Sequence, residues 1–515
     1  MSTPDLKDKS KLTRLELITL IAAATVTITL VSTCSPLYPF NPWDDANCFF
    51  TLGRGIKHGL VPYRDLYEQK GPLLYFIYTL VAFISEKSFI GAWIIECLTA
   101  SLFAIYSWKI IKLFTEPSAF MLFLMPVFLG ITYSNGMFNF GGNAEEICFP
   151  LITAALYFGL RSIVQRDGLP RNSEALICGL ITGILFWIKF TFIGFIVGFC
   201  IYIIIISIRK KDFKRLFGLI WRFFAGFIIV SIPVLAYFLA SNSLSYLWES
   251  YFYNKLFYIN TVEPQGIMRI PVLKNIIITV VSLGIVSVKY PHFPVQLLFT
   301  LLSMFFIDKK YRKKVLLLFS VSLVLATIFA FLSYAVIYYY GYILSYCFGL
   351  GLIPFIVLMK KTATVLKERS KLIKPLSAVA LTAVYALTIF LCKNMYLFLK
   401  PRQFLPQYRI ADTIKKTPDA KVLTYDFMDS GFYTAAEILP QNRYYCYNNI
   451  ADIFPDIREE QDRLIDEGYF DYVITTYFSD FDSENYELIQ EESGTFVDFT
   501  GEPILEDYRL YKRVN

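Results

Sequence analysis

The stretch 190-FTFIGFIVGFCIYIIIISI-208 holds 19 residues without a single charge. A helix of this length crosses the roughly 30 Å thick hydrocarbon core of a bilayer. Comparable apolar stretches recur between residues 15 and 398, and only 18% of the chain is charged. Soluble globular proteins carry about 25% charged residues. Because helices satisfy their own backbone polar groups in lipid, the expected fold class is an all-α polytopic membrane protein.

The apolar stretches predict the membrane spans and leave three segments undecided. The predicted spans cover residues 15–33, 88–112, 117–134, 144–161, 174–188, 190–208, 217–240, 315–333, 342–360 and 375–398. The shorter segments 71–84, 272–288 and 292–307 either cross the bilayer or lie at its interface. We expect an odd number of crossings, 11 or 13, because the charge pattern places the two ends of the chain on opposite sides.

Lysine and arginine mark the loops expected to be cytoplasmic. They gather in residues 1–14, 209–215, 309–314 and 360–374. The loops expected to face outward are 34–70, 134–146, 241–271 and 334–341. Lys-, Ile-, Phe- and Tyr-rich usage fits a bacterial protein. We therefore expect a multi-pass protein of the bacterial plasma membrane with a cytoplasmic N-terminus.

A water-soluble tail is expected to follow the membrane region (residues 1–399). Residues 400–515 contain 23 acidic and 12 basic residues, a net charge of −11. Alternating patterns predict strands at 421–425 and 472–475 and an amphipathic helix at 455–468. The tail is therefore expected to be a small extracytoplasmic α/β domain. An acidic tail beside basic loops is not the charge pattern of a nucleic-acid-binding protein.

The first outer loop gathers candidate functional side chains. Asp44 and Asp45 follow the first span, and a second polar group precedes the next apolar segment; its members are Arg64, Asp65, Glu68 and Lys70. Carboxylates and cations at the headgroup level suit acid–base chemistry on a phosphorylated lipid. The alternative interpretation is a solvated loop with ordinary surface charges.

Three further charged residues lie at the edges of predicted spans. Glu145 and Glu146 open the span at 144–161, where acids are also expected simply because they favour a helix N-terminus. Lys189 lies between two apolar runs, and an ionisable residue within a membrane region is a functional candidate by default. The alternative for Lys189 is a short turn from which its side chain snorkels to the interface.

Other polar features carry weaker signals. Six tyrosines are interpreted as an interfacial aromatic belt, with hydrogen bonding to a lipid phosphate or a sugar as the alternative; they are Tyr334, Tyr338, Tyr339, Tyr340, Tyr342 and Tyr346. Cys34 and Cys48 share the first outer loop, although their spacing is only weak evidence for a disulfide. The histidines His58 and His292 stand alone in the sequence, so no metal site and no cofactor are predicted.

The chain resembles a known enzyme superfamily in several of these features. They are the Asp44–Asp45 pair, the motif G-x-x-P-Y-R-D-L-Y-E-x-K-G-P-L at 59–73, the Asn143 and Glu145 turn, and Lys189. Together they are similar to the GT-C superfamily of polytopic glycosyltransferases. Within it, the chain resembles the bacterial branch related to dolichyl-phosphate-mannose–protein mannosyltransferases and lipid A aminoarabinose transferases. The resemblance covers mainly residues 35–190.

The resemblance implies a mechanism. Such enzymes transfer a sugar, with inversion, from a polyprenyl-phosphate carrier to an acceptor hydroxyl on a cell-envelope glycan, lipid or protein. It implies Asp45 or Asp44 as the base, with Asp45 slightly favoured. It implies Arg64, Lys70 and Lys189 for the lipid phosphate, and it gives sugar or acceptor binding to Asp65, Glu68, Glu145 and Glu146. Some relatives use a divalent metal and others do not.

Two departures and two other functions stay open. The family often has one acid or Asp-Glu where this chain has Asp-Asp, and many relatives have two prolines in place of Gly71-Pro72. A transporter or flippase of lipid-linked saccharides is the main alternative, although transporters place ionisable sites near the bilayer midplane. A protein that merely displays the acidic tail is the weaker one.

Overall fold

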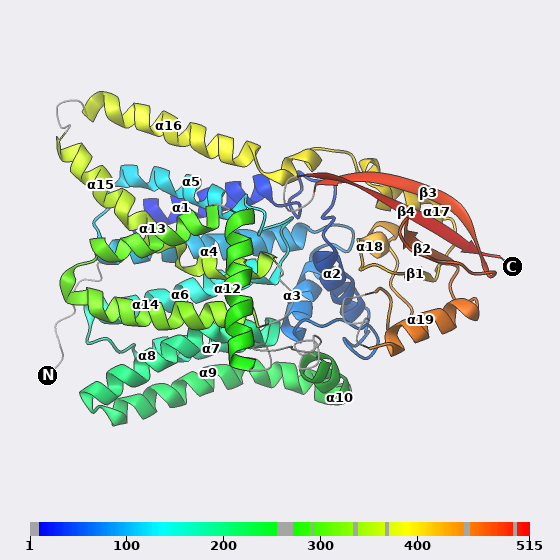
Figure 1. The fold of residues 1–515 in the computed structure, drawn as a ribbon, viewed down its shortest axis with the longest axis horizontal. Coiled ribbons are helices and arrows are strands. Elements are labelled where there is room, and N and C mark those ends of the chain that lie inside the picture. Colours follow the sequence, from blue (N-terminus) through cyan, green and yellow to red (C-terminus); the bar gives the residue numbers. More distant parts are fainter. Residues whose placement is uncertain are drawn as a thin grey trace.

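The computed structural model describes residues 10–254, 271–290, 292–332, 338–365, 370–447, 454–497 and 502–514. A long bundle of helices carries a small sheet at one end (Figure 1). The helices along the bundle are α1 (Arg14–Val31), α4 (Ile90–Phe114), α5 (Leu124–Tyr133), α6 (Ala144–Gln165), α7 (Asn172–Ile188), α8 (Gly194–Lys210), α9 (Phe213–Ala240), α13 (His292–Phe306), α14 (Lys309–Ala330), α15 (Leu352–Val365) and α16 (Ser370–Phe390). The predicted fold class is confirmed.

Within the described residues, seven helices are individually long and apolar enough to span a membrane. Shorter apolar helices, among them α5 and α7, complete the bundle. Helices α5, α8 and α15 are each preceded by a 3-10 helix, namely η1 (Ala119–Phe123), η2 (Phe190–Ile193) and the longer η5 (Tyr338–Gly351). The chain is therefore a multi-pass membrane protein, and the predicted 11 or 13 crossings stay a prediction.

The undecided segment 71–84 lies at one end of the bundle. Helices α1 and α4 run antiparallel, since Lys112 near the end of α4 pairs with Glu16 near the start of α1 at 2.9 Å. At the opposite end, Trp93 Nε1 donates to Thr29 Oγ1 at 3.2 Å. The chain between α1 and α4 thus leaves and re-enters the bundle at the same end. Segment 71–84, which forms α3 (Pro72–Ile84), therefore does not cross.

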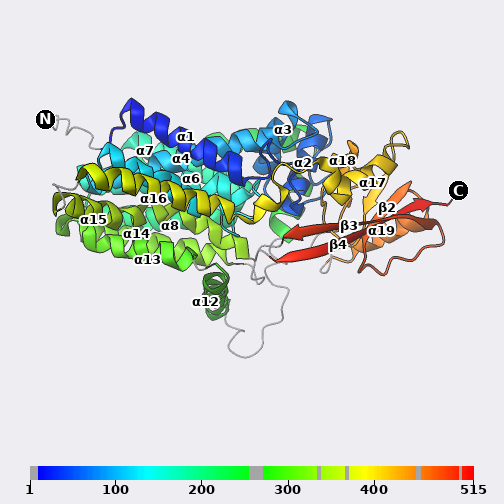
Figure 2. The same cartoon turned by 90° about the horizontal axis from the view of Figure 1, so that it is seen from above.

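The other two undecided segments, 272–288 and 292–307, form two helices with a bend between them. Helix α12 (Pro271–Lys289) meets α13 at an angle of 109°, measured over residues 276–289 and 292–306. Figure 2 shows α12 projecting from the bundle while α13 runs along it. Of the two segments, only α13 is therefore aligned to cross.

The stretch 34–70, expected to be a polar loop, contains a buried helix. Helix α2 (Asp44–Lys57) has acids in its first turn and bases in its last, which complements the helix dipole. It packs against α3 so closely that a Cβ at Gly53 would overlap the backbone of Tyr78. The polar sequence of this stretch did not predict a buried helix, because α2 is covered by protein and not by lipid. The nearby turns α10 (Leu244–Leu247) and η3 (Trp248–Tyr253) follow α9.

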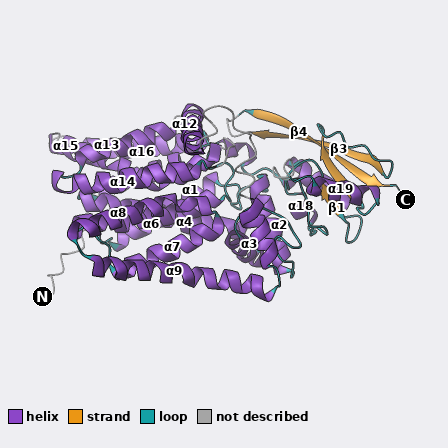
Figure 3. Cartoon of the chain, turned by 60° about the horizontal axis from the view of Figure 1, so that its bottom comes forward, coloured by secondary structure: helices purple, strands orange, loops and turns teal. Residues whose placement is uncertain are grey.

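The tail is the predicted small α/β domain. Its elements are η7 (Lys393–Leu397), η8 (Arg402–Phe404), α17 (Pro406–Ile414), β1 (Val422–Thr424), α18 (Phe432–Ala436), α19 (Asp456–Asp466), β2 (Tyr472–Thr476), β3 (Tyr486–Val497) and β4 (Pro503–Arg513). The sheet has the order β1-β2-β4-β3, with β1 and β2 parallel and the others antiparallel (Figure 3). The strands predicted at 421–425 and 472–475 are β1 and β2, and the helix predicted at 455–468 is α19. The long β3–β4 hairpin was not predicted.

The tail docks onto the segment between α1 and α4. Arg54 on α2 donates to the carbonyl of Tyr433 at 3.1 Å, and Thr51 donates to Asp429 at 2.5 Å. Arg443 donates to the carbonyl of Tyr63 at 2.9 Å. Buried apolar residues of the tail, such as Phe432, belong to the same hydrophobic cluster as the bundle core. Helix α2 is thus held between α3 and the tail.

Candidate active site

The two acids that open α2 point to different partners. Asp45 is buried and lies 3.4 Å from the Nζ of Lys70. The hydroxyl of Tyr339 donates to the same carboxylate at 2.8 Å. Asp44 instead accepts a hydrogen bond from Ser430 of the tail at 2.5 Å. Asp45 therefore faces the membrane bundle, while Asp44 fixes the tail.

Lys70 is held by its backbone. Its amide donates to Glu68 Oε2 at 2.7 Å, and its carbonyl accepts from Tyr63 at 2.6 Å and from Tyr75 at 3.0 Å. The following amide, of Gly71, donates to the carbonyl of Ile188 at 2.9 Å. The main chain of the Lys70 loop is thereby pinned to the end of α7.

Glycine at position 71 is what allows that approach. A Cβ there would overlap the carbonyl oxygen of Trp187, so any side chain would push the loop away. Lys189 follows directly, as the C-cap of α7. Gly71 thus brings two cations that are distant in sequence, Lys70 and Lys189, to the same end of the bundle.

Lys189 is a buried cation whose partners are one carboxylate and the rings of Tyr340 and Phe192. Its Nζ lies 2.9 Å from Glu145 Oε1, and the two side chains are 8% and 2% exposed. The same Nζ lies 3.4 Å from the centre of the Tyr340 ring, a cation–π geometry. The alternative of a snorkelling side chain does not apply, because the ammonium is enclosed by protein.

Glu146 has a different role from its neighbour Glu145. It completes a capping box with Asn143 at the start of α6. The amide of Gly142 donates both to Glu146 Oε1 at 2.6 Å and to Glu96 Oε1 at 2.7 Å. Two buried carboxylates therefore meet at one N–H group, which fixes the turn that carries Glu145.

Arg64 and Asp65 form a pair of their own. Arg64 Nε lies 2.8 Å from Asp65 Oδ1, and Arg64 also donates to the carbonyl of Ser241 at 3.2 Å. The Asp65 partner raises the pKa of Arg64 and Arg64 lowers the pKa of Asp65. The structure therefore brings together Asp45, Glu68, Lys70, Glu145 and Lys189, and it leaves Arg64 and Asp65 outside that group.

The surroundings shift the pKa values of Lys70 and Asp44. Burial opposes the charge on Lys70, but Asp45 and Glu68 more than offset it, so the pKa of Lys70 is raised. Burial raises the pKa of Asp44, which the Ser430 hydrogen bond partly counters. Asp44 is thus a buried acid in a closed contact with the tail, whereas Asp45 lies beside the Lys70 ammonium.

Several site residues were not predicted from the sequence. Tyr339 and Tyr340 contact Asp45 and Lys189 instead of forming a belt, and Tyr334 lies outside the described residues. Ser430 and Asp429 come from the tail and carried no local signal. Glu96 could have been found, since an ionisable residue inside an apolar span is a candidate by default.

The cysteines and possible metal ligands give little support for other chemistry. All nine cysteines lie in described parts of the chain and are free thiols, so Cys34 and Cys48 are not joined. Cys48 instead hydrogen-bonds with Cys446 of the tail. Among residues 10–254, 271–290, 292–332, 338–365, 370–447, 454–497 and 502–514, no three His, Cys, Asp or Glu side chains are arranged to hold a metal ion. Metal independence stays a prediction.

Comparison with known proteins gives two matches. The family model described as dolichyl-phosphate-mannose-protein mannosyltransferase matches residues 69–237. The crystal structure of ArnT from Cupriavidus metallidurans bound to undecaprenyl phosphate is similar at 10% sequence identity, 96% coverage of this chain, 97% coverage of that chain and a TM-score of 0.56. The chain therefore has the fold of this ArnT structure. No curated protein sequence matches it.

The two matches cover different parts of the chain. The family match begins at Gln69 and includes Lys70, Glu145 and Lys189, but it stops short of Asp45. The structural match covers nearly the whole chain and so includes the tail. The predicted resemblance to the GT-C superfamily is confirmed.

Proposed function

We propose that the chain transfers a sugar from a polyprenyl-phosphate donor to a hydroxyl of a cell-envelope glycan, lipid or protein. The observation that carries the proposal is the meeting of Asp45, Lys70, Glu145 and Lys189 at one end of a membrane bundle. The similar ArnT structure, which contains undecaprenyl phosphate, supports a donor of this class.

In the proposed reaction Asp45 is the base. The acceptor oxygen attacks the anomeric carbon while the bond from that carbon to the phosphate oxygen breaks, which inverts the configuration. The acceptor proton passes to Asp45, and the bonding electrons leave with the polyprenyl phosphate. A base must lie within hydrogen-bond reach of that proton. Tyr339 orients Asp45 through its 2.8 Å hydrogen bond.

Lys70 and Lys189 are proposed to receive the leaving phosphate. Negative charge grows on that group as the bond breaks, and buried cations stabilise it most strongly. Each lysine is paired with a carboxylate, Asp45 at 3.4 Å and Glu145 at 2.9 Å, so the charges of the four side chains balance. Donor binding would loosen these pairs and free Asp45 to act on the acceptor.

The remaining site residues are assigned supporting roles. Glu68 fixes Lys70 and is the nearest candidate for a sugar hydroxyl, while Glu145 positions Lys189. Arg64 and Asp65 are proposed to bind the acceptor as a pair and not the donor phosphate. We propose no bound metal or other cofactor.

The proposed location is the outer face of a bacterial plasma membrane. The basic ends of α8 and α14, with residues 209–215 and 309–314, lie at the end of the bundle opposite the site. The positive-inside rule puts those ends in the cytoplasm. The N-terminus would then be cytoplasmic and the tail domain, proposed to begin at residue 400, extracytoplasmic.

The test compares the two adjacent acids. Purified protein would be given a polyprenyl-phosphate sugar and an envelope extract, and the released polyprenyl phosphate would be measured. Asp45→Asn is expected to lower turnover by about 10² to 10⁴, the usual contribution of a general base. Asp44→Asn keeps an oxygen for Ser430 and is expected to cost less than about tenfold.

Two results would contradict the proposal. Release that is unchanged in Asp45→Asn would remove the base assignment. A wild-type protein that moves intact donor across a vesicle membrane, without releasing polyprenyl phosphate, would identify a transporter.

A further inference from the structure

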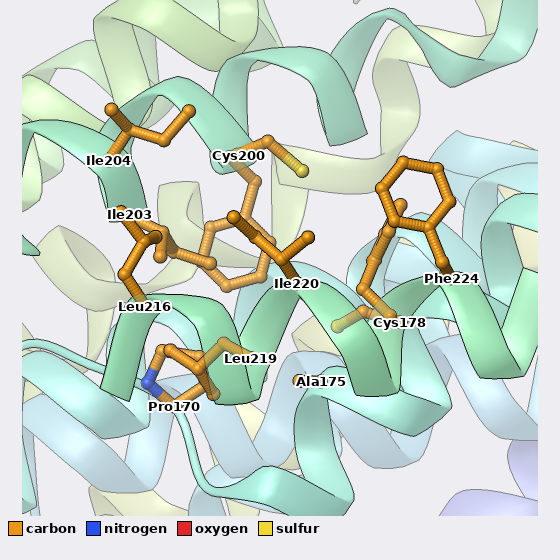
Figure 4. Close-up of a pocket in the computed structure, with 12 residues that line it drawn as sticks. Pro170, Ala175, Cys178, Cys200, Ile203, Ile204, Leu216, Leu219, Ile220 and Phe224 are labelled. Carbon is orange, nitrogen blue, oxygen red and sulfur yellow. The ribbon is translucent and has the colours of Figure 1, made fainter. Parts of the chain in front are cut away.

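An apolar groove of about 270 Å³ lies between α7, α8 and α9 (Figure 4). Three pairs of residues illustrate its walls, namely Ala175 and Cys178, Ile203 and Ile204, and Leu219 and Ile220. Pro170 closes it at the end that leads to the loop between α8 and α9. The groove therefore belongs to the half of these helices away from Lys189, and it is separate from the candidate active site.

The groove opens toward the surface that lipid would cover. Ile204, Ile220 and Phe224 line it and are 40%, 38% and 53% exposed. Its volume is near the small end of the range for ligand pockets, which suits one hydrocarbon chain and not a head group. No polar side chain lines it, so a polar ligand would find no partner there.

Cations lie directly beyond the closed end. Arg215 donates to the carbonyl of Pro170 at 3.3 Å and, with Lys210, pairs with Asp167. Arg209, Lys211 and Lys214 are exposed and form no ion pair within the described residues. These three cations lie at the turn between α8 and α9, beside Lys210 and Arg215, at the end of these helices where Pro170 lines the groove.

We propose that the groove and these cations form a binding site for one anionic phospholipid. One acyl chain fills the groove, and the phosphate lies among Arg209, Lys211 and Lys214. Charge complementarity selects an anionic over a zwitterionic head group, since each basic residue at an anionic surface adds to binding. The polyprenyl donor is not the occupant, because its phosphate belongs at Lys70 and Lys189 at the opposite end. The site does not depend on the proposed glycosyl transfer.

The experiment measures lipid binding directly. Delipidated full-length protein in detergent would be titrated with phosphatidylglycerol or phosphatidylcholine, and bound lipid counted by native mass spectrometry. Wild type is expected to prefer phosphatidylglycerol. Changing Arg209, Lys211 and Lys214 together to Gln is expected to weaken its binding roughly 100-fold. Changing Lys309, Lys310 and Lys313 to Gln removes the same charge from the start of α14 and is the matched control.

A second variant tests the groove itself. Ile220→Trp fills the groove, whereas Ile229→Trp adds the same bulk on α9 at a 54% exposed position outside it. Loss of phosphatidylglycerol binding in Ile220→Trp, with retention in Ile229→Trp, would support the site. Equal binding of the two lipids by wild type, or undiminished binding by either the Gln variant or Ile220→Trp, would overturn it.

Discussion

At the scale of single residues, acids that are adjacent in the sequence make different contacts. Asp44 and Asp45 are adjacent, yet one contacts the tail and the other contacts Lys70. Glu145 and Glu146 differ in the same way, since one pairs with Lys189 and the other meets Glu96 at Gly142. On a helix, successive side chains point about 100° apart, so adjacent acids reach different surroundings. Each pair therefore offers its own internal control.

The two basic–acidic pairs of the site can be compared by neutralising each as a unit. Changing Lys189 and Glu145 together to Gln avoids leaving an unpaired buried charge, which would itself cost about 3–5 kcal/mol. We expect this double variant to fold and to lose about 10² to 10³ in turnover, because a cation at the leaving phosphate is gone.

Arg64→Gln with Asp65→Asn is the matched control for that experiment. It also removes one ion pair, but from outside the Asp45 group, and it is expected to change KM more than kcat. Equal losses of kcat in the two double variants would contradict the assignment of Lys189 to the phosphate.

Glu96 offers a prediction about stability. Two buried carboxylates at one N–H group cannot both be ionised in a dry site, so one already holds a proton. Glu96→Gln imitates that neutral form and is expected to leave the melting temperature almost unchanged. Glu96→Ala leaves the buried carboxyl group of Glu146 without its Glu96 partner and is expected to cost about 1–3 kcal/mol. Thermal unfolding in detergent measures both, and a larger loss in Gln than in Ala would refute this account.

At the scale of elements, sequence reasoning succeeded where lipid sets the pattern. The apolar runs at 190–208 and 217–240 became α8 and α9, because a chain in hydrocarbon has few alternatives to helix. It failed at α2, which is covered by α3 and the tail, and at the β3–β4 hairpin, whose alternation is weak and interrupted by a bulge near Gln490. Such elements depend on partners that are distant in sequence.

The site residues differ in the same way, since some have a local sequence signal and others depend on partners distant in sequence. Asp45, Lys70, Glu145 and Lys189 were predicted from a local motif and from charges at span ends. Tyr339 could not be assigned, because its contact with Asp45 joins residues 294 apart in the chain. Asp44 could not be separated from Asp45 until the position of Ser430 was known.

The junction between α3 and α7 makes a prediction at this scale. Gly71→Ala places a methyl group against the carbonyl of Trp187 and must displace the Lys70 loop. A displacement of about 1 Å in a positioned group costs about 100-fold in rate, and we expect that loss of turnover. Gly218→Ala on α9, where the nearest atom is 3.5 Å away, is the control. Normal turnover of Gly71→Ala would show that the loop is not held as described.

At the scale of the whole molecule, the bundle and the tail form one continuous core. Phe432 and Tyr433 of the tail pack in the same cluster as Phe49 of α2. Arg443 reaches the carbonyl of Tyr63 in the outer segment. The tail therefore supports the helix that carries Asp45, and removing residues 405–515 would expose that helix instead of merely deleting an appendage.

Docking of the tail is expected to depend on pH through Asp429. Burial raises its pKa to about 6, above the ordinary value of about 3.9. The docked state thus binds more protons, so docking is favoured at low pH and weakens as pH rises through about 6. The slope is at most about 1.4 kcal/mol per pH unit.

Limited proteolysis of the tail at pH 5 and pH 7.5 measures this effect. Wild type is expected to be better protected at pH 5, and Asp429→Asn, which is neutral at both values, to show a smaller difference. The same pH dependence in wild type and Asp429→Asn would assign it to another group.

The contact between Ser430 and Asp44 joins residues 386 positions apart in the chain. Helix α2 is synthesised long before the segment that covers it. Asp44 and Thr51 therefore stay uncovered until Asp429 and Ser430 have been made. The covering segment must then fold against α2 before that helix is held in place. Chains that terminate before Asp429 would therefore leave this side of α2 without its cover.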